Sequence, residues 1–145
     1  MNAARRTLKL GRHKTRATIG LAATALAVVA AASPAGAASP PSTSPTVSHP
    51  YYSSSSSIPA CSSGYACAIV SYGSGYYVFN FYNYGTYSLS NWIGRGGLTN
   101  AQTGGAAVRT YDSSGKQISC YPAAHITAEV DWTPVWSIKL TSSGC

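Results

Sequence analysis

Residues that could carry out hydrolysis are scarce in the second half of this chain. A serine nucleophile needs a histidine base and an acid that orients it, and His125 is the single histidine from residue 60 onward. Glu129 and Asp131 are the nearest carboxylates in the sequence and the sole pair that could serve a glycosidase. Two carboxylates two positions apart on a strand share one face, too close together to flank a scissile bond. We therefore expect that the chain is not an enzyme.

Four cysteines are the other residues with distinctive chemistry: Cys61, Cys67, Cys120 and Cys145. In an exported chain an even count predicts two disulfides, for which three pairings are possible. We favour a short first loop, Cys61–Cys67, together with Cys120–Cys145, which would hold the last residue. Zinc is the alternative, but the C-x5-C spacing is long for a zinc knuckle and only His125 could add a ligand. We expect no metal and no cofactor.

The first 37 residues indicate export. Six of the ten basic residues lie there, at Arg5, Arg6, Lys9, Arg12, Lys14 and Arg16. An uncharged apolar run, 17–32, follows them and precedes Ala35-Gly36-Ala37, which fits the A-x-A cleavage pattern. The run is shorter than the roughly 20 residues that a membrane-spanning helix needs. We expect residues 1–37 to be a cleaved secretion signal and the mature protein to be extracellular, with no membrane contact after cleavage.

Removing the signal changes the charge of the chain. The full sequence carries a net charge of +7, but residues 38–145 keep four basic and three acidic side chains, which gives 4 − 3 = +1. Binding to a nucleic-acid backbone requires several clustered Lys and Arg residues. We therefore expect no nucleic-acid partner, and we expect a monomer.

The mature chain divides by composition into two parts. Residues 38–59 are rich in Ser, Thr and Pro, carry no charge and show no apolar periodicity, which predicts a disordered linker. His49, within it, is expected to be solvated. Residues 60–145 hold all four cysteines and form the expected disulfide-stapled β domain.

Short strand patterns fill that domain. Apolar, aromatic or alternating runs predict strands at 66–71, 76–82, 106–111, 116–121, 126–130 and 135–140. Asp112-Ser113-Ser114-Gly115 between two of them predicts a hairpin, whereas the glycine run 94–97 is expected to be a turn. In the run 76–82, Tyr77, Phe79 and Phe81 share the expected core face. Together these signals predict an all-β, small Greek-key sandwich whose core includes Trp92, Trp132 and Trp136.

Binding is a better candidate than catalysis, because tyrosine and tryptophan give large, rigid contact surfaces. The chain holds eleven tyrosines and three tryptophans. Four tyrosines exceed what the core should need and could form a stacking platform for a cell-wall glycan or other polysaccharide: Tyr72, Tyr82, Tyr84 and Tyr87. A secreted glycan-binding module is therefore the alternative function.

The segment 61–67, Cys-Ser-Ser-Gly-Tyr-Ala-Cys, resembles the C-x-x-G-x-x-C opening of actinobacterial secreted peptidase inhibitors of the metalloproteinase-inhibitor type. Segments 84–92 and 100–106 are also similar to members of that group. The resemblance implies a βγ-crystallin-like fold and inhibition of an extracellular protease. A disulfide and a proline would stiffen one candidate inhibitory loop: Cys120, Tyr121, Pro122, Ala123, Ala124 and His125. Arg95 is an alternative reactive position for a trypsin-like pocket.

Overall fold

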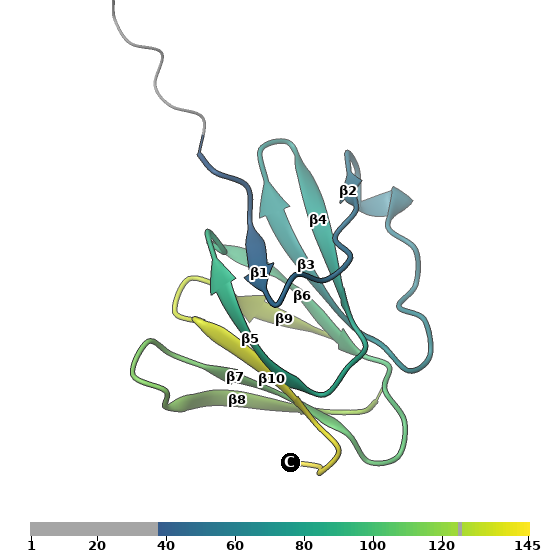
Figure 1. Ribbon diagram of the computed structural model, residues 1–145. Helices are drawn as coiled ribbons and strands as arrows, with labels where there is room; N and C mark the ends of the chain where they lie inside the picture. Colours follow the sequence, from purple (N-terminus) through teal and green to yellow (C-terminus); the bar gives the residue numbers. More distant parts are fainter. Residues whose placement is uncertain (1–37, 125) are drawn as a thin grey trace, which may run out of the picture. The chain divides into compact units, whose positions relative to one another are not determined.

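The computed structural model describes residues 38–124 and 126–145. The secretion signal expected at residues 1–37 lies outside this range, and so does His125. Ten strands form two five-stranded sheets, and every pair of neighbouring strands is antiparallel (Figure 1). One 3-10 turn, η1 (Ser55–Ser57), is the only helical element in the described part of the chain. The predicted all-β sandwich is confirmed.

The two sheets draw their strands from the whole described chain. Sheet A has the order β1 (Ser42–Ser44), β5 (Gly85–Ser90), β10 (Ser137–Thr141), β7 (Ala107–Tyr111), β8 (Gln117–Pro122). Sheet B has the order β2 (Tyr51–Tyr52), β4 (Gly75–Phe81), β3 (Ala66–Tyr72), β6 (Arg95–Asn100), β9 (Thr127–Asp131).

The connections make two Greek-key units that exchange a strand. In β3–β6 the fourth strand returns to lie beside the first, as a Greek key requires, while the third strand, β5, joins sheet A. In β7–β10 the fourth strand again lies beside the first, and the third strand, β9, joins sheet B. Each unit therefore contributes one strand to the sheet that holds the other three strands of its partner unit.

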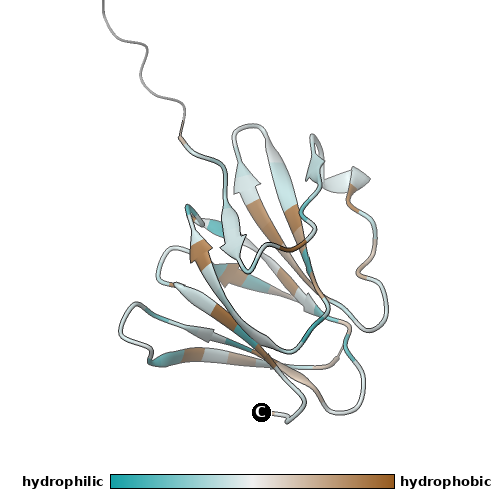
Figure 2. Ribbon diagram, viewed as in Figure 1, coloured by the Kyte–Doolittle hydropathy of each residue, from teal (hydrophilic) through white to brown (hydrophobic). Residues whose placement is uncertain are grey.

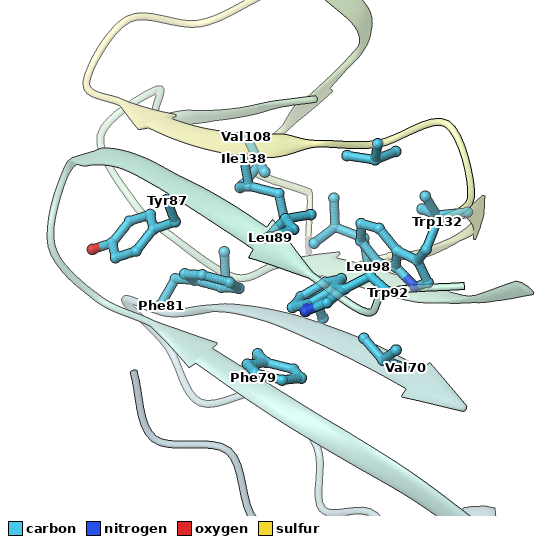
Figure 3. Close-up of a cluster of buried hydrophobic side chains, with 14 of the residues drawn as sticks. Val70, Phe79, Phe81, Tyr87, Leu89, Trp92, Leu98, Val108, Trp132 and Ile138 are labelled. Carbon is cyan, nitrogen blue, oxygen red and sulfur yellow. The ribbon is translucent and has the colours of Figure 1, made fainter. Parts of the chain in front are cut away.

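The core lies between the sheets, and Figure 3 shows its aromatic part. Phe79 and Phe81 of β4 are fully buried and Tyr77 packs against them, which confirms the predicted core face. The rings of Trp92 and Trp132 pack edge to face, with their centroids 4.8 Å apart. Figure 2 shows the most hydrophobic residues within the strands of both sheets. The prediction for Trp136 was wrong, because its side chain is exposed.

Two strands, β5 and β6, differ from the sequence expectation. The run 94–97 was expected to be a turn, but Arg95, Gly96 and Gly97 begin β6. Gly96 lies in the strand because its missing side chain leaves room for Trp132. Alternation in Gly85–Ser90 could have predicted β5, whose Tyr87 and Leu89 are buried.

Residues 38–59, expected to be a disordered linker, are folded onto both sheets. Strand β1 pairs with β5 through Thr43↔Leu89, and β2 pairs with β4 through Tyr51↔Tyr77. His49, expected to be solvated, is half-buried and stacks on Phe79 at 5.1 Å. The segment has no apolar periodicity because it does not form a core layer of its own. It instead covers the open edges of β5 and β4, where backbone hydrogen bonds suffice.

Both disulfides have the predicted pairing, Cys61–Cys67 and Cys120–Cys145, and each joins Cα atoms 5.8 Å apart. This pairing uses all four cysteines. Two intact disulfides are consistent with an oxidising environment.

The predicted hairpin between β7 and β8 is present, and it gives a pH-dependent contribution to stability. Asp112 Oδ1 accepts hydrogen bonds from the Ser114 hydroxyl and from the amides of Ser114 and Lys116. These bonds, chiefly the one from the Ser114 hydroxyl, lower the pKa of Asp112. A carboxyl whose pKa is lower in the folded state adds stability above its unfolded pKa of about 3.9 and loses it as pH falls through the folded value.

We expect Asp112→Asn to flatten the fall in unfolding free energy as the pH drops below about 4. Urea denaturation at a series of pH values measures this. Asp131 is the matched comparison, because a hydrogen bond from the Thr133 amide also lowers its pKa. The pH profile of unfolding free energy should be flatter for the double variant, with Asn at both positions, than for either single variant. An Asp112→Asn profile that parallels the parent below pH 4 would contradict the assignment.

Candidate functional site

The expected inhibitory loop at 120–125 is mostly strand. Cys120, Tyr121 and Pro122 belong to β8 and pair with Arg109, Val108 and Ala107 of β7, respectively. The amides of Ala123 and Ala124 donate to the carbonyls of Ala106 and Asn100. His125 lies outside the described residues. The backbone from 120 to 124 is therefore engaged in the sandwich and is not a free loop.

Tyr121 is also unsuited to be an exposed anchor. Its side chain is half-buried and packs against the core. Its carbonyl accepts a hydrogen bond of 2.9 Å from Asn100 Nδ2. The disulfide and the proline in this segment stiffen a sheet edge, because the last residue of the chain is bonded to β8 through Cys145.

Arg95, the alternative reactive position, lies at the start of β6 and not in a flexible turn. Its guanidinium donates to Glu129 Oε1 on the neighbouring strand β9, and this bond is the first cause of its raised pKa. Both side chains are exposed, so the ion pair adds little stability. Glu129 and Asp131 thus have structural partners, Arg95 and Thr133.

The four tyrosines proposed as a glycan platform do not share one exposed surface. Tyr87 is buried in the core, where its hydroxyl donates to the Asn83 carbonyl and burial raises its pKa. Tyr72 is half-buried at the β3–β4 hairpin and packs on Tyr77. Only Tyr82 and Tyr84 are strongly exposed, in the connection from β4 to β5. The platform as predicted was wrong.

One exposed segment has the features that the loop at 120–125 lacks. The segment Ile58–Cys61 follows η1 and runs to the first disulfide without belonging to a strand. Ile58 has an extended backbone, with φ −73° and ψ 121°, and its side chain is half-buried, whereas Pro59 and Ala60 are exposed. We call these four residues the strap.

The strap crosses the outer face of sheet B. It borders a hollow of about 680 Å³ that Ile69 and Thr99 also line, and a second of about 350 Å³ beside Tyr65. Its backbone is bonded only at the start, where the Ile58 amide donates to the Ser55 carbonyl. Among the described residues, no hydrogen-bond partner is found for the backbone amides of Ala60 and Cys61.

The strap was not predicted from the sequence, because Pro59 belongs to the segment that was expected to be a disordered linker. The signal was nevertheless present. A proline lies two residues before Cys61, just as Pro122 lies two residues after Cys120. Either pattern stiffens a segment beside a disulfide, and only the tertiary structure distinguishes the segment that is paired from the one that is not.

Other kinds of site find no support in the part of the chain that is described. Residues 38–124 and 126–145 contain no cluster of three or more His, Cys, Asp or Glu side chains placed to hold a metal ion. Over the same residues, no helix has the length and apolar character needed to cross a membrane. Comparison with known proteins adds no further candidate. No protein-family model, curated protein or solved structure matches this chain.

Proposed function

We propose that this chain is a secreted inhibitor of an extracellular endopeptidase and that the strap, Ile58–Cys61, is the segment that enters the peptidase cleft. The observation that carries the proposal is a segment with an extended backbone at Ile58, exposed residues at Pro59 and Ala60, and no hydrogen-bond partner among the described residues for the amides of Ala60 and Cys61. An extended segment of this kind can add main-chain hydrogen bonds to a strand of its partner.

The strap is held in place before binding. Cys61 is bonded to Cys67 on β3, Pro59 has a restricted backbone, and η1 precedes Ile58. Constraints of this kind reduce the ordering cost of binding and so favour affinity. The Greek-key sandwich and the resemblance of segment 61–67 to the opening of the inhibitors both support the crystallin-like, inhibitory assignment.

The composition of the strap indicates which peptidases it fits. Its side chains are apolar, and no charged residue occurs between residues 38 and 94. Trypsin-like enzymes select a basic residue with an aspartate in the specificity pocket, whereas many other endopeptidases have apolar pockets. Arg95 does not supply a basic residue to this cleft, because it lies at the start of β6 and not in the strap. The proposal therefore favours thermolysin-like or subtilisin-like targets.

The test is an inhibition panel of thermolysin-like, subtilisin-like and trypsin-like enzymes with the secreted protein. We expect Ala60→Asp to raise the inhibition constant tenfold or more, because a charge would enter an apolar cleft; tenfold corresponds to about 1.4 kcal/mol. Ser53→Asp is the matched control, since it adds the same charge at an exposed position before η1. Circular dichroism checks that both variants fold.

Two outcomes would contradict the proposal. If the parent inhibits none of the three classes, the inhibitor assignment fails. If Ala60→Asp inhibits as well as the parent while Pro122→Ala inhibits more weakly, the end of β8, and not the strap, is the segment that enters the cleft.

A further inference from the structure

A third hollow lies on a different part of the domain, where the β5–β6 and β9–β10 connections meet. Its volume is about 500 Å³, within the range of small-molecule sites. Its lining residues are Leu89, Ser90, Asn91, Trp92, Ile93, Thr133, Val135 and Trp136. None of them is charged. We infer that this hollow is a binding site for a neutral saccharide, with Trp136 as the surface on which a sugar ring stacks.

Trp136 differs from the other two tryptophans in its exposure. Its side chain is 59% exposed, whereas Trp92 is 4% exposed and Trp132 is fully buried. Its backbone is nevertheless fixed, since its amide donates to the Tyr111 carbonyl and its carbonyl accepts from the Leu89 amide. An exposed indole on a fixed backbone offers a flat stacking surface, and the C–H face of a sugar ring is the apolar surface that matches it.

Polar, uncharged side chains complete the lining. Asn91 has a positive φ of 62° and anchors its amide nitrogen on the Pro40 carbonyl, at 3.3 Å. Thr133 Oγ1 accepts a hydrogen bond from the Gly94 amide at 3.0 Å, and the same hydroxyl also bonds to Asp131. Non-glycine residues with positive φ are uncommon and cluster at functional sites. Amide and hydroxyl groups beside an aromatic face suit the hydroxyl groups and apolar face of a neutral sugar.

The neutral lining discriminates between partners. A phosphate, an acidic polymer or a charged peptide would find no side chain of opposite charge in this hollow. The polar groups around Trp136 distinguish it from an all-apolar surface for a second copy of the chain. This inference is independent of peptidase inhibition, because the lining shares no residue with the strap.

Two experiments test the inference on the secreted protein. The first is sedimentation with insoluble cellulose, chitin and β-1,3-glucan. The second is titration with the corresponding soluble hexasaccharides, followed by tryptophan fluorescence. Because Trp136 is the only strongly exposed tryptophan, sugar binding should shift its emission and protect it from acrylamide quenching. We expect at least one of these glycans to bind, with little dependence on salt.

Trp136→Ala should weaken that binding at least tenfold, and Trp136→Phe should retain part of it. Tyr84→Ala is the matched control, because it removes an exposed aromatic side chain elsewhere and should bind as the parent does. Ala60→Asp should also bind normally, and Trp136→Ala should still inhibit a peptidase, so that the two proposals fail separately.

Three results would overturn the inference: no binding of the parent to any of the glycans, undiminished binding by Trp136→Ala, or loss of binding in Tyr84→Ala alone. Concentration-dependent self-association that Trp136→Ala abolishes, without glycan binding, would instead identify the hollow as a contact between copies. Sedimentation velocity detects that outcome.

Discussion

Gly96→Ala is expected to destabilise the domain by roughly 2–6 kcal/mol, a large share of the 5–15 kcal/mol typical of a folded domain. An added Cβ at Gly96 would lie 2.0 Å from the Ile69 carbonyl oxygen and 2.5 Å from Trp132 Nε1. These two atoms are joined by a hydrogen bond of 2.9 Å. The methyl group would therefore separate β3 from β6 or displace the indole. Overpacking costs about 1–3 kcal/mol, and an unsatisfied buried donor about as much again.

Urea denaturation measures the loss, and Gly97→Ala is the control. At Gly97 the nearest atom to an added Cβ is the Thr127 side-chain methyl at 3.0 Å, which can move aside, so we expect a loss below about 1.5 kcal/mol. Equal losses in the two variants would show that the Ile69–Trp132 bond is not the cause.

A double-mutant cycle isolates the contribution of the indole. Trp132→Phe removes the N–H group, so Gly96→Ala should cost less in that background than in the parent. Simple addition of the two losses would contradict the proposed clash with the indole nitrogen.

Removing the disulfide Cys120–Cys145 is expected to cost about 3–4 kcal/mol, and removing Cys61–Cys67 only about 2 kcal/mol, because the longer loop restrains the unfolded chain more. The bonds join residues 25 and 6 positions apart, respectively. Paired Cys→Ser variants and urea denaturation test this ranking. The reverse order would mean that folded-state contacts at Cys61–Cys67 outweigh loop entropy.

The same variants bear on inhibition. Loss of Cys61–Cys67 frees one end of the strap, so the inhibition constant should rise even where the domain remains folded. Loss of Cys120–Cys145 should leave inhibition unchanged under folding conditions, because that bond holds β8 to the end of the chain.

Trp136 shows how far local pattern predicts this fold. Ile138 and Leu140 are buried on β10, and extending that alternation backwards places Trp136 inside. The strand begins only at Ser137, however. Val135 is buried one position earlier, and Trp136 is bonded through its backbone to Tyr111 and Leu89 while its side chain turns outward. Alternation is a property of a strand and does not continue into the preceding turn.

The sequence alone determined the features that depend on neighbouring residues or on cysteine count. These are the all-β class, the β7–β8 hairpin, the core face of β4 and the two disulfides. Each follows from side-chain alternation, turn chemistry or the closure of a loop, which operate within a short stretch of chain.

Tertiary structure alone decided which candidate segments are free. Residues 120–124 and Ile58–Cys61 both combine a proline with a cysteine. The backbone of the first segment bonds to β7 and to the Asn100 carbonyl, whereas the second belongs to no strand. It likewise decided that Tyr87 is buried, Trp136 is exposed and residues 38–59 are folded. The exposure of a side chain and the pairing of a strand at a sheet edge depend on segments that are distant in the sequence. A local pattern therefore cannot predict which sheet edge a polar segment will cover.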